Sequence, residues 1–198
     1  QLRRAIEIRK DLPGDRRGLL FSKSYLADVL RALERWSEAE ELYLDTWKAQ
    51  RLELGPDDGE TLKTASGLAE LRSLAGDLEG AEALIDEILG TQLEVRGEEH
   101  PDTLQSLTTL AHIRNQQGRY DEALELCERA MAAGARSLGA EHTAVLQAAT
   151  EKVAALRGTG LEDEARALAG RVVASYSTTL GDEHPTTIAA QGVLEKGL

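Results

Sequence analysis

The residue types in this chain that could do chemistry are its histidines, its carboxylates and its one cysteine. His100, His142 and His184 recur at intervals of 42 residues. A metal site needs ligands within about 2 Å of one ion, and equivalent positions of successive repeats are spread along a chain. Proline follows His100 and His184, and proline is favoured at the first position of a helix. We therefore expect these histidines at helix starts, and neither a metal site nor a cofactor site.

Motifs of common enzyme sites are missing from the sequence. It has no G-x-x-x-x-G-K phosphate loop, no H-E-x-x-H and no G-x-S-x-G. Acid–base catalysis needs two carboxylates held apart in a cleft, and the pattern sets no such pair apart. Cys127 lies among apolar residues at helical spacing, which predicts a buried, inert thiol. We expect no enzyme activity in this chain.

Composition narrows the class of partner. The net charge is -12, which argues against binding to nucleic acid. No apolar run approaches the ~20 residues of a membrane span, and the single cysteine fits a reducing, cytoplasmic setting. The stretch 1–55 is nearly neutral, whereas the stretch 56–198 carries a large excess of Asp and Glu over Lys and Arg. The chain begins with Gln1 in what reads as the end of a helix, so we expect a piece of a larger protein.

A constant period of 42 residues organises the whole chain. It is carried by small and aliphatic residues that recur in register: Gly55, Gly97, Gly139 and Gly181; Ala39, Ala81, Ala123 and Ala165; Leu20, Leu62, Leu104, Leu146 and Ile188. A fixed period of this size is typical of a solenoid built from repeated units.

One repeat, residues 97–139, shows what the unit is. Leu104, Leu107 and Leu110 have the spacing of a helix with one buried face. Gly118 follows that stretch and predicts its end, and a second apolar stripe starts at Ala123. Two helices joined by so short a turn pack as an antiparallel hairpin. The sequence therefore predicts an all-α solenoid of such hairpins.

The same repeat resembles the tetratricopeptide repeat (TPR). The pair Leu110-Ala111, the turn residues Gly118 and Tyr120, and the small residue Ala123 match that motif. The longer step and the joint L-G-x-x-H-P-x-T-L resemble kinesin light chains, and similar repeats follow the nucleotide-binding module of NB-ARC-type signalling proteins. The resemblance implies a right-handed superhelix. Its expected divisions are 1–17 (the end of a preceding repeat), 18–59, 60–101, 102–143, 144–185 and 186–198 (a first helix only), all within one domain.

In the TPR family the first helix of each hairpin lines a concave groove, and the resemblance carries that role to particular positions here. These are Ser24, Asp28 and Arg31; Lys63, Ser66 and Glu70; Gln105, Thr108, His112, Asn115 and Gln116; and Gln147 and Arg157. The Lys/Asn ladder of chaperone-binding TPRs is absent, since Gly67 stands one helical turn after Lys63. The paired Asn of kinesin light chains is replaced by Thr108 and Thr109.

Three functions are compatible with this pattern, and the third of them is a structural spacer with no ligand of its own. The first is a scaffold that binds a protein or peptide segment, for which a basic segment is one option. The second is the sensor or oligomerisation arm of an NB-ARC-type signalling ATPase whose nucleotide site lies outside this sequence. Self-association through the open ends of the solenoid is a further expectation.

Overall fold

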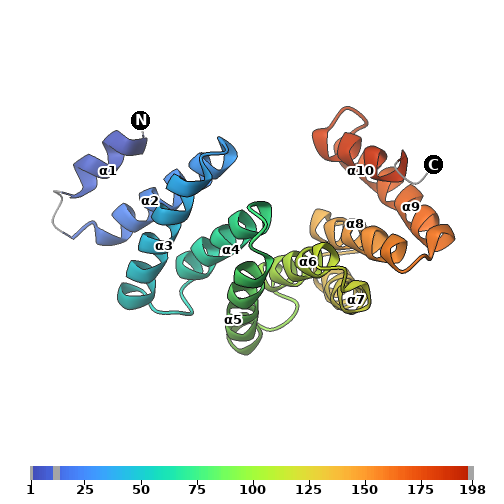
Figure 1. The fold of residues 1–198 in the computed structure, drawn as a ribbon, viewed down its shortest axis with the longest axis horizontal. Helices are drawn as coiled ribbons and strands as arrows, with labels where there is room; N and C mark the ends of the chain where they lie inside the picture. The colour runs from blue at the N-terminus through green and yellow to red at the C-terminus, as the bar shows by residue number, and fades with distance from the viewer. Residues whose placement is uncertain (1, 11–13, 196–198) are drawn as a thin grey trace. The chain divides into compact units, whose positions relative to one another are not determined.

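The computed structural model describes residues 2–10 and 14–195 of the chain, and every regular element in that part is an α-helix (Figure 1). The expected divisions that reach residues 1, 11–13 and 196–198 lie partly outside the described residues. The helices are α1 (Leu2–Lys10), α2 (Arg16–Ala32), α3 (Trp36–Glu53), α4 (Gly59–Leu74), α5 (Leu78–Arg96), α6 (Pro101–Gln116), α7 (Tyr120–Ser137), α8 (Thr143–Gly158), α9 (Glu162–Leu180) and α10 (Pro185–Glu195).

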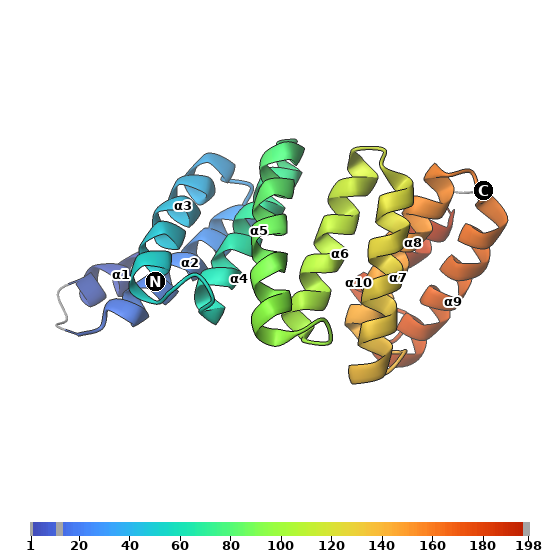
Figure 2. The same cartoon turned by 90° about the horizontal axis from the view of Figure 1, so that it is seen from below.

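The chain forms two compact units, residues 1–91 (unit 1) and residues 92–198 (unit 2), and the division falls within α5. In unit 1, α2 packs against α1 and α3, and α3 packs against α4. In unit 2, each of α6 to α9 packs against the next helix, and Figure 2 shows α6, α7 and α8 side by side. The predicted all-α stack of helical hairpins is confirmed within each unit.

Small residues inside each hairpin allow this close packing. Ala39, Ala81, Ala123 and Ala165 are all 0% exposed. The leucine at a second recurrent position is also buried in each repeat, from Leu20 at 1% to Leu146 at 5% exposure. Ile188, at the same position in α10, is the exception and is 52% exposed. The alanines and the four leucines therefore face the interior, as the constant period predicts.

Histidines begin the first helices in unit 2, which confirms the expectation from the sequence. The Nδ1 atoms of His100 and His142 each accept a hydrogen bond, at 3.2 Å, from the backbone N–H two residues further on. His184 Nδ1 accepts from Thr186 N–H in the same way. In unit 1, Asp58 takes this role with a 2.9 Å bond from Glu60 N–H. Such caps satisfy donors that the first turn of a helix leaves unpaired.

Each of four hairpin turns has one residue with a left-handed backbone conformation (positive φ). That residue is glycine in three of the turns and glutamate in the first. Gly76, Gly118 and Gly160 have φ of 86°, 74° and 82°. Glu34 stands at the corresponding place in the first hairpin with φ 59°. Side chains disfavour this region by about 1–2 kcal/mol, so the first turn carries a local strain that glycine relieves elsewhere.

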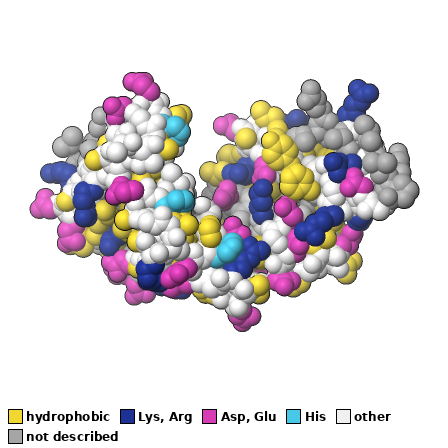
Figure 3. All heavy atoms as spheres, turned by 180° about the vertical axis from the view of Figure 1, so that it is seen from behind, with side chains coloured by type: hydrophobic (Ala, Val, Ile, Leu, Met, Phe, Trp, Pro, Cys, Tyr) yellow, Lys and Arg dark blue, Asp and Glu magenta, His cyan; other side chains and the backbone are white. Residues whose placement is uncertain are grey.

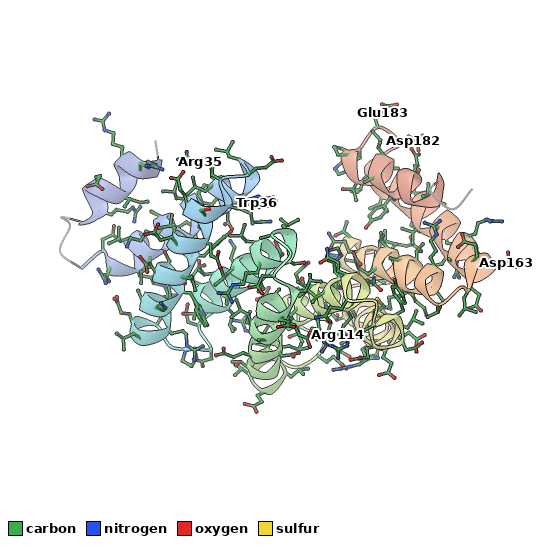
Figure 4. The ribbon with its side chains drawn as sticks, in the orientation of Figure 1. Arg35, Trp36, Arg114, Asp163, Asp182 and Glu183 are labelled. Carbon is green, nitrogen blue, oxygen red and sulfur yellow. The ribbon has the colours of Figure 1, made fainter. Side chains whose placement is uncertain are left out.

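The start of α3 is defined by Arg35. The helix begins at Trp36 after the cap residue Arg35, whose side chain makes no capping hydrogen bond. The Arg35 Nε–H donates to Glu38 at 2.7 Å. This contact lowers the pKa of the Glu38 carboxyl group. Figure 4 places Arg35 and the half-exposed Trp36 at the end of the α2–α3 hairpin.

Candidate functional site

The first helices of adjacent hairpins contact each other directly, and this contact creates the candidate site. In unit 1, α2 contacts α4, and in unit 2, α6 contacts α8. We call these two contact lines the α2–α4 seam and the α6–α8 seam. Residues that the sequence predicts for a partner-binding groove lie along both seams.

The α2–α4 seam contains a linked set of polar side chains. The Tyr43 hydroxyl group, which comes from α3, donates to Asp28 Oδ1 at 2.5 Å. The Arg31 guanidinium lies 3.2 Å from Glu70 Oε2 and also interacts with the Tyr43 hydroxyl group. Burial, with a contribution from Asp28, raises the pKa of Tyr43 well above its ordinary value, so the hydroxyl group stays protonated and can donate. The α2–α4 seam therefore already contains an ion pair, between Arg31 and Glu70.

Gly67 makes room for this arrangement. A Cβ atom at Gly67 would lie 2.9 Å from both Cε1 and Oη of Tyr43. The Tyr43 side chain is 0% exposed, so the ring fills the space that a side chain on α4 would need. Sequence reasoning identified Gly67 only as a departure from the chaperone-binding ladder, and it did not identify Tyr43 as a seam residue.

The other predicted residues of unit 1 lie apart from this network. Ser24 is buried and its hydroxyl group donates to the Phe21 carbonyl, while Ser66 donates to the Leu62 carbonyl. Lys63 is exposed on α4. Hydrophobic side chains also reach the surface of unit 1 (Figure 3), and those exposed on α2 include Phe21 and Tyr25.

The α6–α8 seam contains a second linked set, made of different residue types. His112 Nδ1 lies 3.2 Å from each carboxylate oxygen of Glu151, and Gln116 Nε2 lies 3.0 Å from His112 Nε2. Asn115 Nδ2–H donates to the Glu151 backbone carbonyl at 3.0 Å and to its Oε2 at 3.2 Å. Asn115 therefore fixes both the helix and the side chain of its neighbour. The structure brings together three predicted residues, His112, Asn115 and Gln116.

Glu151 is the residue of this set that sequence reasoning missed. Its signal was its place in the period, since Glu151 stands two full periods after Gly67. Likewise Cys127 stands two full periods after Tyr43. In unit 2 the carboxylate of Glu151 is therefore paired in position with the small buried thiol of Cys127. At the corresponding positions of unit 1, Gly67 is paired with the large ring of Tyr43.

Other predicted residues of unit 2 have separate roles. Thr108 is buried and its hydroxyl group donates to the Leu104 carbonyl at 2.9 Å. Gln105 and Gln147 are exposed on α6 and α8. Arg157 lies at the far end of α8, 3.6 Å from Glu162 of α9, so it belongs to the hairpin turn rather than to the His112 set. Arg114, which Figure 4 labels, is likewise directed to a turn residue, Glu122, at 3.5 Å.

Histidine side chains are visible on the surface of unit 2 (Figure 3). His100 and His142 belong to separate helix starts. Within residues 2–10 and 14–195, no group of three or more His, Cys, Asp and Glu side chains is placed to hold a metal ion. Cys127 is 0% exposed, and burial, with a contribution from Glu151, raises the pKa of its thiol to about 12.

None of the helices in the described part of the chain has both the length and the apolar character of a bilayer span.

Comparison with known proteins agrees with this geometry. A tetratricopeptide repeat family model matches residues 18–92 and 102–156, and a second one matches residues 145–186. No curated protein matches the chain by sequence. The chain is 30% identical to the nearly identical TPR-like repeats of a kinesin light chain-type protein from Podosopora anserina, over 90% of this chain and 84% of that one. The TM-score is 0.73, and it is 0.75 for a single-substitution variant of that protein.

A further solved structure is similar in fold. BtubC (BKLC) from P. vanneervenii is 21% identical, with a TM-score of 0.79 over 93% of this chain and 73% of that chain. The helix hairpins, the buried alanines and the family match lead to one conclusion. The chain belongs to the tetratricopeptide repeat family, with repeats of the kinesin-light-chain-like kind.

Proposed function

We propose that this chain holds a segment of a partner protein along the first-helix seams of its repeats. Its family consists of protein-interaction scaffolds that are generally not enzymes. The finer proposal concerns the place and chemistry of binding. The partner segment lies on α2 and α4 in unit 1, on α6 and α8 in unit 2, or on both.

The observation that carries this proposal is the fixed position of the seam side chains before any partner arrives. Asn115 bonds to both backbone and side chain of Glu151, and Gln116 contacts His112. In unit 1, Tyr43 and Arg31 fix Asp28 and Glu70. Side chains that are already ordered lose little conformational entropy on binding, and such preorganisation raises affinity.

The chemistry of the exposed seam residues suits a polypeptide partner. Gln105, Gln116 and Gln147 are exposed amides, each of which can donate and accept. Amides of this kind can bond the N–H and C=O groups of an extended segment or the polar face of a helical one. Lys63 adds a cation in unit 1.

A displayed library of random short peptides, selected on the immobilised chain, tests the proposal. Enriched peptides are then measured against seam variants Lys63→Glu and Gln105→Glu. Both positions are exposed, so neither change disturbs the core. Arg31 is a poorer choice for charge reversal because it is committed to Glu70.

The control is Glu125→Lys, an exposed position on the second helix α7. We expect at least one seam variant to weaken the enriched peptides while Glu125→Lys leaves them bound. A selection that enriches no peptide, or peptides that respond equally to all three variants, would refute binding at the seams.

A further inference from the structure

We propose that the α6–α8 seam binds a cationic side chain, preferentially arginine, of the partner segment at the carboxylate of Glu151 beside His112. The inference rests on the proposed function, and it names the charge and the atom that the partner must present.

The surroundings of Glu151 carry the first step. Its side chain is 22% exposed, so the carboxylate is largely withdrawn from water yet remains reachable. Among the described residues, its side-chain bonds come from His112 and from the neutral amide of Asn115. A largely buried carboxylate is most stable beside a cation. Neither residue is an arginine or a lysine, so these bonds bring no guanidinium or ammonium group to the carboxylate.

Two basic residues of α8 near Glu151 pair with other carboxylates. Lys152, the next residue on α8, lies 2.8 Å from Glu128 of α7. Arg157 lies at the helix end beside Glu162. The residues that face the seam from α6 at its exposed edge, Gln105 and Gln116, carry no charge. Apart from His112, the described side chains that face the seam therefore supply no positive charge to Glu151.

Unit 1 provides the internal precedent for the missing cation. There Arg31 of the first helix lies 3.2 Å from Glu70 of the next first helix. The position two full periods after Arg31 is Asn115, a neutral side chain. The seam of unit 1 supplies its own guanidinium, and the seam of unit 2 has a carboxylate on the second of its helices without one. A partner arginine would give Glu151 the kind of partner that Arg31 gives Glu70, although Glu151 stands at the position of Gly67 and the position of Glu70 is held by Ala154.

Arginine fits better than lysine for a geometric reason. The guanidinium group is planar and can donate two parallel N–H bonds to one carboxylate, and it stacks on flat rings. His112 has a side-chain exposure of 43% directly beside Glu151, so its ring offers such a surface. The amides of Gln105 and Gln147 remain available for the backbone on either side.

The test uses random short peptides displayed on phage, selected on the wild-type chain and counter-selected on Glu151→Gln. Gln keeps the shape of the side chain and removes its charge. The matched control is Glu125→Gln, the same change at an exposed position of α7. We expect the enriched peptides to share a basic residue and to lose about tenfold or more in affinity on Glu151→Gln. Glu125→Gln is expected to change their affinity less than about twofold, because exposed charges contribute little.

Two further changes make the result specific. Replacing the shared arginine of a peptide by citrulline, which is neutral and of the same shape, should lower its affinity by the same factor as Glu151→Gln does. Asn115→Arg should also abolish preference for basic peptides, because it supplies an internal guanidinium as Arg31 does. Each variant is first compared with wild type by circular dichroism and thermal melting.

The outcomes separate this inference from the proposed function. Peptides that bind at the seams but respond equally to Glu151→Gln and Glu125→Gln would overturn the cation site and leave the scaffold function standing. Enriched peptides without Arg or Lys would do the same. A library that yields no binder at all would refute both.

Discussion

Gly67 offers the sharpest test of the packing at the α2–α4 seam. A Cβ atom there would approach Cε1 and Oη of Tyr43 to 2.9 Å and Cζ to 3.0 Å. The ring is fully buried and bonded to Asp28, so it cannot easily move away. Overpacking of this kind costs about 1–3 kcal/mol. In the opposite direction, the higher helix propensity of alanine stabilises the folded chain by about 1 kcal/mol when it replaces glycine inside a helix.

A second helical glycine isolates the propensity contribution. Gly90 lies within α5, and a Cβ atom there would meet nothing within 4 Å. We therefore expect Gly90→Ala to raise the free energy of unfolding by about 1 kcal/mol. Gly67→Ala should lower it by roughly 0–2 kcal/mol, the sum of the two contributions. Urea unfolding followed by the helical circular dichroism signal gives both midpoints.

A companion substitution identifies the clash. In a Tyr43→Leu background the ring is gone, so Gly67→Ala should behave like Gly90→Ala. The double-mutant cycle then gives a coupling between the two positions of about 1–3 kcal/mol. If Gly67→Ala stabilises the wild-type chain as much as Gly90→Ala does, the ring does not occupy the space over Gly67 and the account of this seam is wrong.

Other predictions concern single groups. Glu34→Gly should raise the free energy of unfolding by roughly 0.5–1 kcal/mol, because relief of the left-handed conformation exceeds the entropy that glycine adds to the unfolded chain; thermal melts check it, and a lower melting temperature would count against it. His142→Ala should cost about 0.5–2 kcal/mol in urea unfolding, whereas His142→Asn keeps the cap; equal losses would show that the cap bond is unimportant. Thr61→Val should stabilise by about 1 kcal/mol, because the buried Thr61 hydroxyl group has no hydrogen-bond partner among the described residues; a destabilised variant would contradict this. Burial raises the pKa of the Cys127 thiol to about 12, so the native chain should not react with Ellman's reagent at about pH 8, where an ordinary thiol is partly ionised; rapid labelling without denaturant would disprove its burial.

The recurrent positions made the fold readable from the sequence. Ala123 and Leu104 recur because each repeat meets the same neighbour in the same way, and burial confirms both. Helix starts were also predictable, because His100 caps the first turn of α6 and proline is favoured at the first helical position, which Pro101 holds.

The candidate site was only partly predictable, because it depends on residues that repeat poorly. The resemblance to TPRs gave the first-helix positions, including His112 and Asn115. It did not give Glu151, whose importance comes from its contact with Asn115 across two different helices. Thr108 shows the opposite error, since it was predicted for the groove but its hydroxyl group bonds within its own helix and the residue is buried.

The two seams show how one repeat can carry different binding surfaces without a change of fold. A large ring from the second helix, Tyr43, requires glycine opposite it, and a small thiol, Cys127, leaves room for a glutamate. The exchange is compensated in volume, so the buried alanines beneath need not change. The charges of the two seams nevertheless differ. The α2–α4 seam contains the pair of Arg31 and Glu70, whereas the α6–α8 seam contains the Glu151 carboxylate bonded to the amide of Asn115. Under the proposed function, specificity belongs to the non-recurrent residues at the seams, because the recurrent residues hold the stack together.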